Sequence, residues 1–261
     1  MATESVLHPR LIVPIGHVEP VPRRVRGTVA GRVVFDTRRA LYVWEWQAYP
    51  QFSIPVADLV DGVLSDDGHM EQLGAGPAHR HTLQVGPEVR AGAAWVWGEG
   101  APGPLHDTVR FEWEALDSWL EEDEPVFVHP RSPYSRVDAL RSNSSVRVEL
   151  DGVVLAEADT CVKLFETGLP TRYYLDPATV HRTRLRPSDT VTRCPYKGTT
   201  SAYWSFDGIT AHEDIAWTYD FPTVQAHRIA GLTAFYNEHV DLYVDGSLLP
   251  KPTDIYRTSS D

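Results

Sequence analysis

Hydrophobic residues occur in short runs that are separated by glycine, proline, asparagine or aspartate. The clearest runs are residues 25–29, 33–35, 41–44, 82–85, 146–150 and 153–155. Asp151 and Gly152 stand between two of them, and this dipeptide is a strong signal for a tight hairpin turn. Residues 162–166 alternate between hydrophobic and polar residues, as expected of a strand with one buried face. The pattern predicts a mainly β fold built from antiparallel strands.

Three segments depart from this pattern. Residues 61–81 are rich in Gly and Asp and poor in hydrophobic residues, which predicts a loop. Residues 107–124 place Phe111, Leu116 and Trp119 at spacings that fit a helical stripe in the later part of the segment. Residues 222–233 predict one short helix after Pro222.

The two halves of the chain repeat one pattern in the same order. The matched pairs, first half then second half, are Gly31 and Gly152, Glu45 and Glu166, Trp95 and Trp217, and Phe111 and Phe235. A weak repeat of more than about 100 residues indicates two related domains and not a solenoid, whose repeats are about 20–50 residues long. We therefore expect tandem domains with the same strand order.

The repeat and the changes in composition suggest domain limits. We expect an extended N-terminal arm (1–24), a first repeat (25–125), an inter-domain junction (126–142), a second repeat (143–250) and a polar tail (251–261).

Charge and cysteine content narrow the classes of function. The 24 basic and 36 acidic residues give a net charge of −12, which disfavours binding to a phosphate backbone. No apolar run approaches the roughly 18–20 residues of a membrane span, and the N-terminus does not resemble a signal peptide. Two cysteines are too few for a disulfide scaffold, so we expect a cytoplasmic protein.

One stretch, residues 192–198 (Thr-Arg-Cys-Pro-Tyr-Lys-Gly), concentrates reactive and conformationally special groups. It carries a thiol, a proline, a phenol, an amine and a glycine, and the first half of the chain has no such stretch. A domain that folds without this stretch in its first copy does not need it merely to fold. We therefore expect residues 192–198 to line a small-molecule pocket in the second repeat, while the first repeat has a degenerate site.

Three residues are the candidates for chemistry. Cys194 is a candidate nucleophile because Lys197 nearby would favour its thiolate, although a free cysteine is also commonly a small core residue. Lys197 is a candidate anchor for an anionic group or a Schiff-base amine, or else a solvated turn residue. Glu166 is a candidate general base, or else the structural counter-ion of Lys197.

Aromatic residues and a glycine complete the expected pocket. The candidate ligand-binding residues are Tyr173, Tyr196, Gly198, Tyr203, Trp204 and Trp217. The alternative for the aromatic residues is an ordinary core, because rings with polar edges suit both places. His79 and His81 lie in one segment but have no cysteine or clear carboxylate partner, so we predict no metal site and no cofactor.

Several further motifs recur in order along the second half of the chain. They are residues 165–170 (Phe-Glu-Thr-Gly-Leu-Pro), Tyr173-Tyr174, the 192–198 stretch, Tyr203-Trp204, residues 216–219 (Ala-Trp-Thr-Tyr) and residues 234–236 (Ala-Phe-Tyr). Together these motifs resemble the bacterial domain of unknown function 427 family, which also carries a nucleotidyltransferase-like label. Residues 126–138 look like the inter-domain stretch of tandem members of that family, and the resemblance covers roughly residues 22–252. It implies two β-tent-like domains, which are small antiparallel sheets folded against each other with few short helices.

The residues themselves do not indicate nucleotidyl transfer, because the sequence lacks a glycine-rich phosphate loop and a pair of aspartates suited to catalytic Mg²⁺. The first functional hypothesis is an enzyme acting on a small polar or anionic metabolite. The second is a non-catalytic ligand-binding or sensor module with an aromatic cage. The third is a scaffold whose tandem domains mediate self-association into a homo-oligomer.

Overall fold

The computed structural model describes residues 13–252, which form two compact units, residues 13–133 and 134–252. Both units are built mainly from antiparallel strands, so the predicted fold class is confirmed. Residues 1–12 of the expected N-terminal arm and residues 253–261 of the polar tail lie outside the described residues, and residues 18–20 of the arm form a strand of the first unit. Within the expected junction, residues 137–142 form a strand of the second unit.

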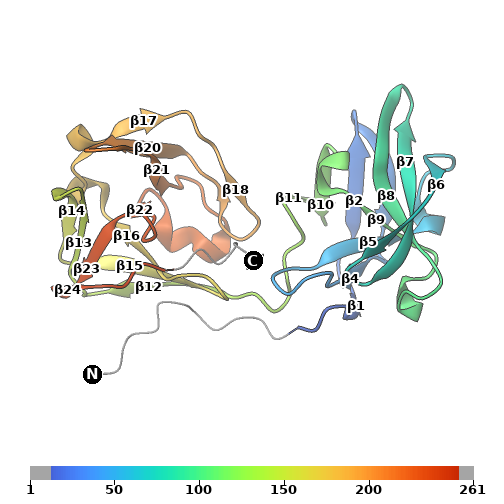
Figure 1. The fold of residues 1–261 in the computed structure, drawn as a ribbon, viewed down its shortest axis with the longest axis horizontal. Coiled ribbons are helices and arrows are strands. Elements are labelled where there is room, and N and C mark those ends of the chain that lie inside the picture. The colour runs from blue at the N-terminus through green and yellow to red at the C-terminus, as the bar shows by residue number, and fades with distance from the viewer. Residues whose placement is uncertain (1–12, 253–261) are drawn as a thin grey trace. The chain divides into compact units, whose positions relative to one another are not determined.

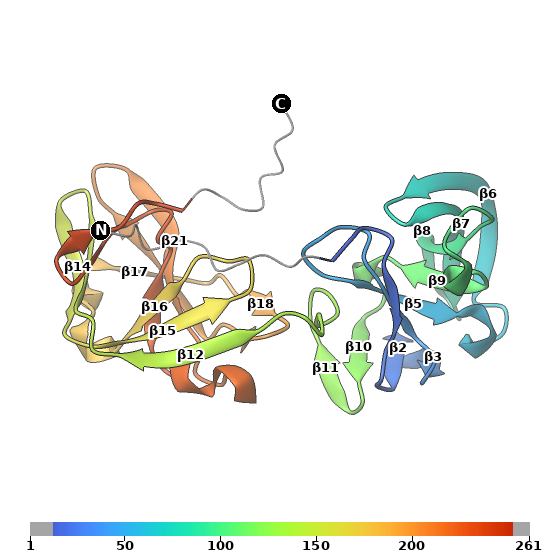
Figure 2. The same cartoon turned by 90° about the horizontal axis from the view of Figure 1, so that it is seen from below.

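The first unit consists of two sheets (Figure 1). Its strands are β1 (Val18–Pro20), β2 (Val25–Val29), β3 (Arg32–Thr37), β4 (Leu41–Val43), β5 (Gln51–Pro55), β6 (Leu64–Leu73), β7 (Gly76–Val85), β8 (Glu88–Trp97), β9 (Thr108–Phe111), β10 (Ser118–Glu121) and β11 (Glu124–Val126). Seven of them form a sheet in the order β1-β4-β5-β9-β8-β7-β6. The other four form a sheet in the order β11-β10-β2-β3, which can be followed in Figure 2. Three short 3-10 helices connect strands: η1 (Val56–Asp58), η2 (Gly103–Leu105) and η3 (Trp113–Ala115).

The second unit repeats this plan. Its strands are β12 (Val137–Ser142), β13 (Val146–Leu150), β14 (Val153–Ala158), β15 (Cys161–Glu166), β16 (Arg172–Leu175), β17 (Arg186–Ser188), β18 (Arg193–Cys194), β19 (Gly198–Thr199), β20 (Ala202–Asp207), β21 (Ala211–Thr218), β22 (Thr233–Phe235), β23 (Asp241–Val244) and β24 (Ser247–Leu248). The sheets have the orders β12-β15-β16-β22-β21-β20-β17 and β14-β13-β23-β24, with β18 and β19 as a separate hairpin. Its 3-10 helices are η4 (Pro177–Thr179), η5 (Arg182–Arg184) and η6 (Val224–Ile229).

Details of the turns confirm that the two units are copies of one plan. The β2–β3 turn has positive φ at Ala30 (48°) and Gly31 (74°), and the β13–β14 turn has positive φ at Asp151 (52°) and Gly152 (74°). Positive φ at both central residues is the signature of the hairpin turn predicted from the Asp-Gly dipeptide. Both hairpins also contain a register shift, at residues 27–28 and at residues 148–149.

Two of the sequence predictions for secondary structure are wrong. The segment expected to be a loop, residues 61–81, contains β6 and the first part of β7, which pair along a long hairpin. Its residues are polar because β6 is an edge strand that is mostly exposed, and its backbone is nevertheless hydrogen-bonded to β7. The expected helical stripe in residues 107–124 is instead β9, η3 and β10, whose buried residues belong to different sheets. The predicted helix in residues 222–233 is the single 3-10 helix η6.

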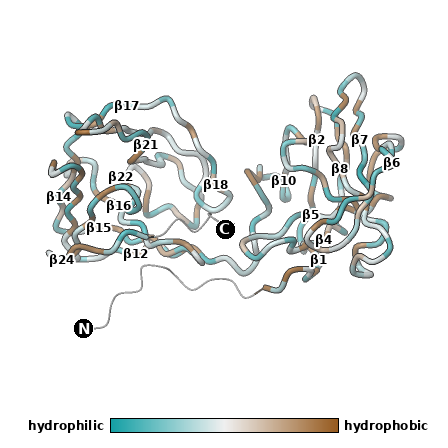
Figure 3. The backbone as a smooth tube through the Cα atoms, viewed as in Figure 1, coloured by the Kyte–Doolittle hydropathy of each residue, from teal (hydrophilic) through white to brown (hydrophobic). Residues whose placement is uncertain are grey.

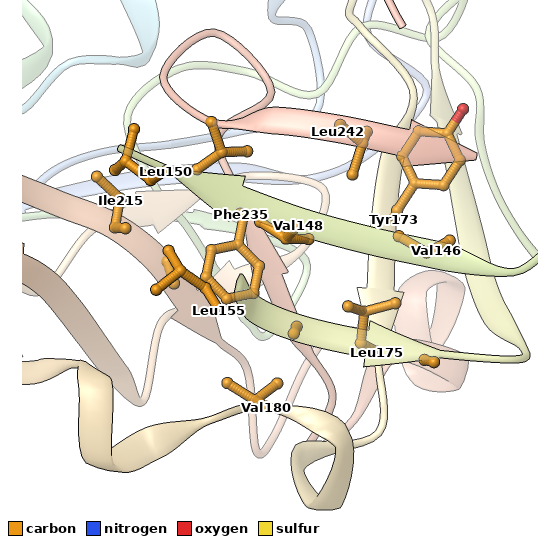
Figure 4. Packing of buried hydrophobic residues seen from close by; sticks show 14 of the residues in the cluster. Val146, Val148, Leu150, Leu155, Tyr173, Leu175, Val180, Ile215, Phe235 and Leu242 are labelled. Atoms are coloured by element: carbon orange, nitrogen blue, oxygen red, sulfur yellow. The ribbon is translucent and has the colours of Figure 1, made fainter. Parts of the chain in front are cut away.

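The core of the second unit lies on one face of its seven-stranded sheet. Val146, Val148 and Leu150 of β13 pack with Leu175 of β16 and Phe235 of β22, as Figure 4 shows. A second buried cluster uses the other face of the same sheet. It contains Ala139, Val162, Leu164, Tyr174, Tyr203, Trp217, Tyr219, Ala226, Ile229 and Ala234. Two of these, Ala226 and Ile229, come from η6, so this helix packs with the second face.

Hydrophobic and hydrophilic residues are interleaved along the strands, without a long uninterrupted hydrophobic segment (Figure 3). Among residues 13–252, no helix has the length and the apolar character needed to cross a membrane.

Candidate functional site

Strand alternation decides which predicted residues share a face of the second unit. Glu166 lies on the same face of β15 as Val162 and Leu164, because side chains two apart along a strand point the same way, and these two residues belong to the second cluster. Tyr174, Tyr203 and Trp217 belong to the same cluster, whereas Cys161 lies in the core on the other face. Glu166 is therefore expected to meet the second cluster, and it is buried there with 5% of its surface exposed.

The 192–198 stretch forms a short hairpin between β17 and β20. Arg193 pairs with Thr199 and Cys194 pairs with Gly198. Thr192 closes the hairpin twice, because its amide donates to Thr200 Oγ1 at 2.8 Å and its carbonyl accepts from the Thr200 amide at 3.0 Å. Gly198 is buried and has a φ of +99°, a conformation that L side chains rarely adopt.

This hairpin brings Lys197 onto Glu166. The Lys197 ammonium donates a hydrogen bond to Glu166 Oε2, and only 13% and 7% of the two side chains are exposed. Burial by itself lowers the pKa of Lys197, but Glu166, and then Cys194 and Tyr174, raise it well above its ordinary value. Lys197 is thus held as a cation, which suits the binding of a negative or polar oxygen atom and disfavours Schiff-base chemistry from the resting state.

The two cysteines have different surroundings. Cys194 is partly exposed and is close enough to Lys197 to contribute to its raised pKa. Cys161 is buried in the core, and burial raises the pKa of its thiol. Because the thiolate is the reactive form, Cys194 is the better placed of the two for chemistry.

Phenols and an indole complete the surroundings of Lys197. Tyr174 is fully buried and accepts a hydrogen bond from Trp217 Nε1 at 3.1 Å, and burial raises its pKa to about 12. Burial also raises the pKa of Tyr219, although Lys197 opposes this shift. Both phenols therefore stay protonated at neutral pH and are able to donate hydrogen bonds. The Tyr203 hydroxyl hydrogen-bonds Thr192 Oγ1 on the hairpin at 2.8 Å.

The structure does not bring all of the predicted ligand-binding residues to Lys197. Tyr173 and Trp204 belong to the core on the opposite face of the sheet, and Figure 4 shows Tyr173 beside Leu242 and Val146. Arg182 lies over the Trp204 ring, with its guanidinium carbon 3.8 Å from the ring centroid. Tyr196 is half-buried in the hairpin, and its carbonyl accepts a hydrogen bond from Thr223 Oγ1. The period of two along a strand separates Tyr173 from Tyr174, and this signal was available from the sequence.

An arginine that sequence reasoning missed covers the aromatic face. The guanidinium carbon of Arg172 lies 5.7 Å from the Trp217 ring centroid and 5.3 Å from that of Tyr236. Glu238 fixes this guanidinium through two hydrogen bonds of 2.6 and 2.8 Å. The position over these rings is therefore filled by a residue of the chain itself.

The first unit keeps the carboxylate but changes its surroundings. Glu45, the counterpart of Glu166, pairs with Arg110 of β9, with Arg110 Nε 3.1 Å from Glu45 Oε1. Arg110 also lies over Trp95, the counterpart of Trp217, 4.8 Å from the ring centroid. The turn between β6 and β7 is packed against Glu45, since a Cβ on Gly74 would come within 2.2 Å of the Glu45 carbonyl oxygen. A short turn thus stands where the second unit has the longer connection that carries Lys197.

No group of three or more His, Cys, Asp or Glu side chains within residues 13–252 is arranged to hold a metal ion. His79 and His81 lie on β7, and the His81 ring bonds the His79 carbonyl at 2.8 Å.

Comparison with known proteins identifies the family of the chain. None of the curated proteins matches the chain. A family model described as a domain of unknown function (DUF427) matches residues 17–122 and residues 138–246. These two matches cover most of the chain, and each falls on one of the two units with a common strand order. The chain therefore belongs to the family of domain of unknown function 427, as a tandem member with two copies of the domain.

Proposed function

We propose that the second repeat binds a small polar or anionic molecule beside Lys197 and acts on it as an enzyme. One observation carries the proposal: a buried Lys197–Glu166 pair is delivered by a hairpin that the first repeat does without. Burying an ion pair is often no better for stability than apolar packing, so such a pair in an added hairpin calls for another reason. In the proposal, that reason is recognition of a ligand.

The residues divide the work according to their chemistry. Lys197 donates hydrogen bonds to an oxygen atom of the ligand and offsets its negative charge. The ligand oxygen replaces part of the hydrogen bonding between Lys197 and Glu166, and Glu166 then accepts a proton from the ligand. Tyr174 and Tyr219 supply neutral donors, because burial raises the pKa of each phenol. Cys194 is the nearest thiol and lines the proposed pocket beside Lys197.

A screen by thermal shift against nucleotides, sugar phosphates and carboxylic acids tests the proposal. A ligand of this site should stabilise the wild-type protein and should slow the alkylation of Cys194. It should not bind a variant carrying both Glu166→Gln and Lys197→Met, which removes the pair without leaving a buried charge. The matched control is Lys163→Met, because Lys163 is on β15 but faces the core side, 5.5 Å from the Tyr173 ring centroid.

Two results would refute the proposal. The first is a ligand that binds the double variant as tightly as it binds the wild type. The second is a complete panel without a hit, which favours the scaffold hypothesis. Retained binding by Cys194→Ala would leave Lys197 as the anchor of the ligand and would show that the thiol is not needed for binding.

The aromatic-cage hypothesis has weaker support. A cationic ligand on Trp217 and Tyr236 would have to displace Arg172, which Glu238 holds with two hydrogen bonds. An anionic or neutral ligand at Lys197 requires no such displacement.

A further inference from the structure

We infer that Thr223 is the positioning residue of the site: it clamps the backbone on both sides of Lys197 and so holds the ammonium on Glu166. The inference rests on the proposed function, in which Lys197 is the anchor for the ligand. Thr223 lies outside the 192–198 stretch and immediately precedes η6.

The clamp consists of two hydrogen bonds from one residue. The Thr223 amide donates to the Lys197 carbonyl at 3.1 Å, and the Thr223 hydroxyl donates to the Tyr196 carbonyl at 2.5 Å. These two carbonyls belong to the peptide groups that precede and follow the Lys197 Cα. Fixing both peptide groups fixes the direction in which the Lys197 side chain leaves the backbone.

The hydroxyl of Thr223 is used in an unusual way. A threonine before a helix commonly accepts a hydrogen bond from an amide of the first turn, which stabilises that helix. Thr223 is the N-cap residue of η6, but its side chain makes no such bond and donates to the hairpin instead. η6 therefore has no N-cap hydrogen bond from the Thr223 side chain, and the hairpin has an additional hydrogen bond to it.

The segment around Thr223 is not held by burial of its neighbours. Phe221 and Val224 flank the clamp and are 91% and 88% exposed. Their hydrophobic side chains therefore add little to the packing of this segment, so the polar contacts carry more of its attachment. Asp220 adds a further contact, since its amide donates to Ser201 Oγ at 2.7 Å.

The first unit lacks the clamp together with the hairpin. The corresponding connection, between β8 and β9, contains η2, and its N-cap residue is Pro102. Proline has neither an amide hydrogen nor a hydroxyl, so it offers neither of the two bonds. The clamp thus occurs only in the unit that carries Lys197.

The rate of chemical labelling of the Lys197 amine reports whether the ammonium is held on Glu166, and the measurement needs no ligand. The chain contains only three lysines, Lys163, Lys197 and Lys251, so mass spectrometry distinguishes them. Acetic anhydride reacts with neutral amines, and each unit of raised pKa lowers the neutral fraction about tenfold. In the wild type, Lys197 should therefore react at least about tenfold more slowly than Lys163.

Variants at Thr223 separate positioning from general stability. Thr223→Val removes the hydroxyl and should raise the Lys197 rate about fivefold or more, approaching that of Lys163. Thr223→Ser keeps both donors and should restore protection. The control is Thr179→Val, which also removes a hydroxyl bond to a carbonyl, that of Asp176 at 2.8 Å, on a short helix away from the hairpin.

An unchanged Lys197 rate in Thr223→Val, with the same fall in thermal midpoint as in Thr179→Val, would overturn the inference. If Thr223→Val does not fold, hydrogen exchange in the wild type decides. A Thr223 amide that exchanges as fast as an unprotected amide refutes the clamp, and a protected one supports it. The two proposals can fail independently. If Lys197 is labelled rapidly in Thr223→Val but no ligand is found, the clamp is supported and the proposed function is not. If a ligand binds in a way that depends on Lys197 but not on Thr223, the proposed function is supported and the clamp is not.

Discussion

Replacing Lys197 with methionine should destabilise the second unit far more than the loss of an ordinary surface charge. The substitution keeps most of the side-chain volume but leaves the carboxylate of Glu166, whose side chain is only 7% exposed, without its cation. Breaking a buried ion pair by removing one partner costs about 3–5 kcal/mol. An exposed pair is worth only about 0–1 kcal/mol, and Arg136→Met supplies that comparison, because the Arg136 side chain is 76% exposed beside Asp138.

The double variant Glu166→Gln with Lys197→Met should recover most of this loss. It leaves no uncompensated charge, and neutral replacements of buried pairs are often within about 1 kcal/mol of the original or more stable. The pair would then contribute geometry to the site, and little net stability to the fold.

Urea unfolding, followed by pulsed hydrogen exchange and mass spectrometry of peptides from residues 134–252, reports on the second unit alone. If Lys197→Met lowers the free energy of unfolding by no more than Arg136→Met does, Lys197 and Glu166 do not behave as a buried ion pair. If the double variant is as unstable as Lys197→Met, the loss does not come from an unpaired charge. Either result would refute the electrostatic reasoning.

Three further predictions follow from the same structure. Iodoacetamide should modify Cys194 well before Cys161, whose thiol has a pKa raised by burial, and equal rates in the native protein would contradict this, with the urea-unfolded protein as the reference. Gly198→Ala should lower the free energy of unfolding by about 1–3 kcal/mol, because φ is +99° there, whereas Gly103→Ala should be nearly neutral in a chemical denaturation series. Burial raises the pKa of Glu45 above its ordinary 4.5 despite the nearby Arg110, so the folded state binds the proton more tightly than the unfolded state does. The free energy of unfolding should therefore fall as the pH rises from 4.5 through the raised pKa, and Glu45→Gln should flatten that part of a stability–pH profile.

The fold was predictable to a large extent because its signals are local. Hairpin turns such as Asp151-Gly152 and alternating strands such as residues 162–166 show their structure within a few residues. The polar edge strand β6 was missed because its pairing with β7 satisfies the backbone whatever its side chains are. The helical stripe in residues 107–124 failed because residues of two sheets happened to recur at helical spacing.

The candidate site was predictable only in part. The sequence singled out Cys194, Lys197 and Glu166, but it also added Tyr173 and Trp204, which alternation places on the core face. Arg172 and Thr223 were missed because neither carries a local signal for its contacts. Arg172 reaches Glu238 across 66 positions, and Thr223 reaches Tyr196 across 27.

The sequence by itself determined the repeat, the antiparallel plan and the 192–198 stretch that only the second copy carries. The repeat and the plan follow from periodicity and turn chemistry, which act between near neighbours, and the stretch follows from comparing the two halves. Only the tertiary structure decided how each buried carboxylate finds its cation: Glu45 takes Arg110 from a strand, and Glu166 takes Lys197 from a hairpin. A buried charge requires a partner, but the sequence offers many cations, and the packing of distant strands selects the one that arrives.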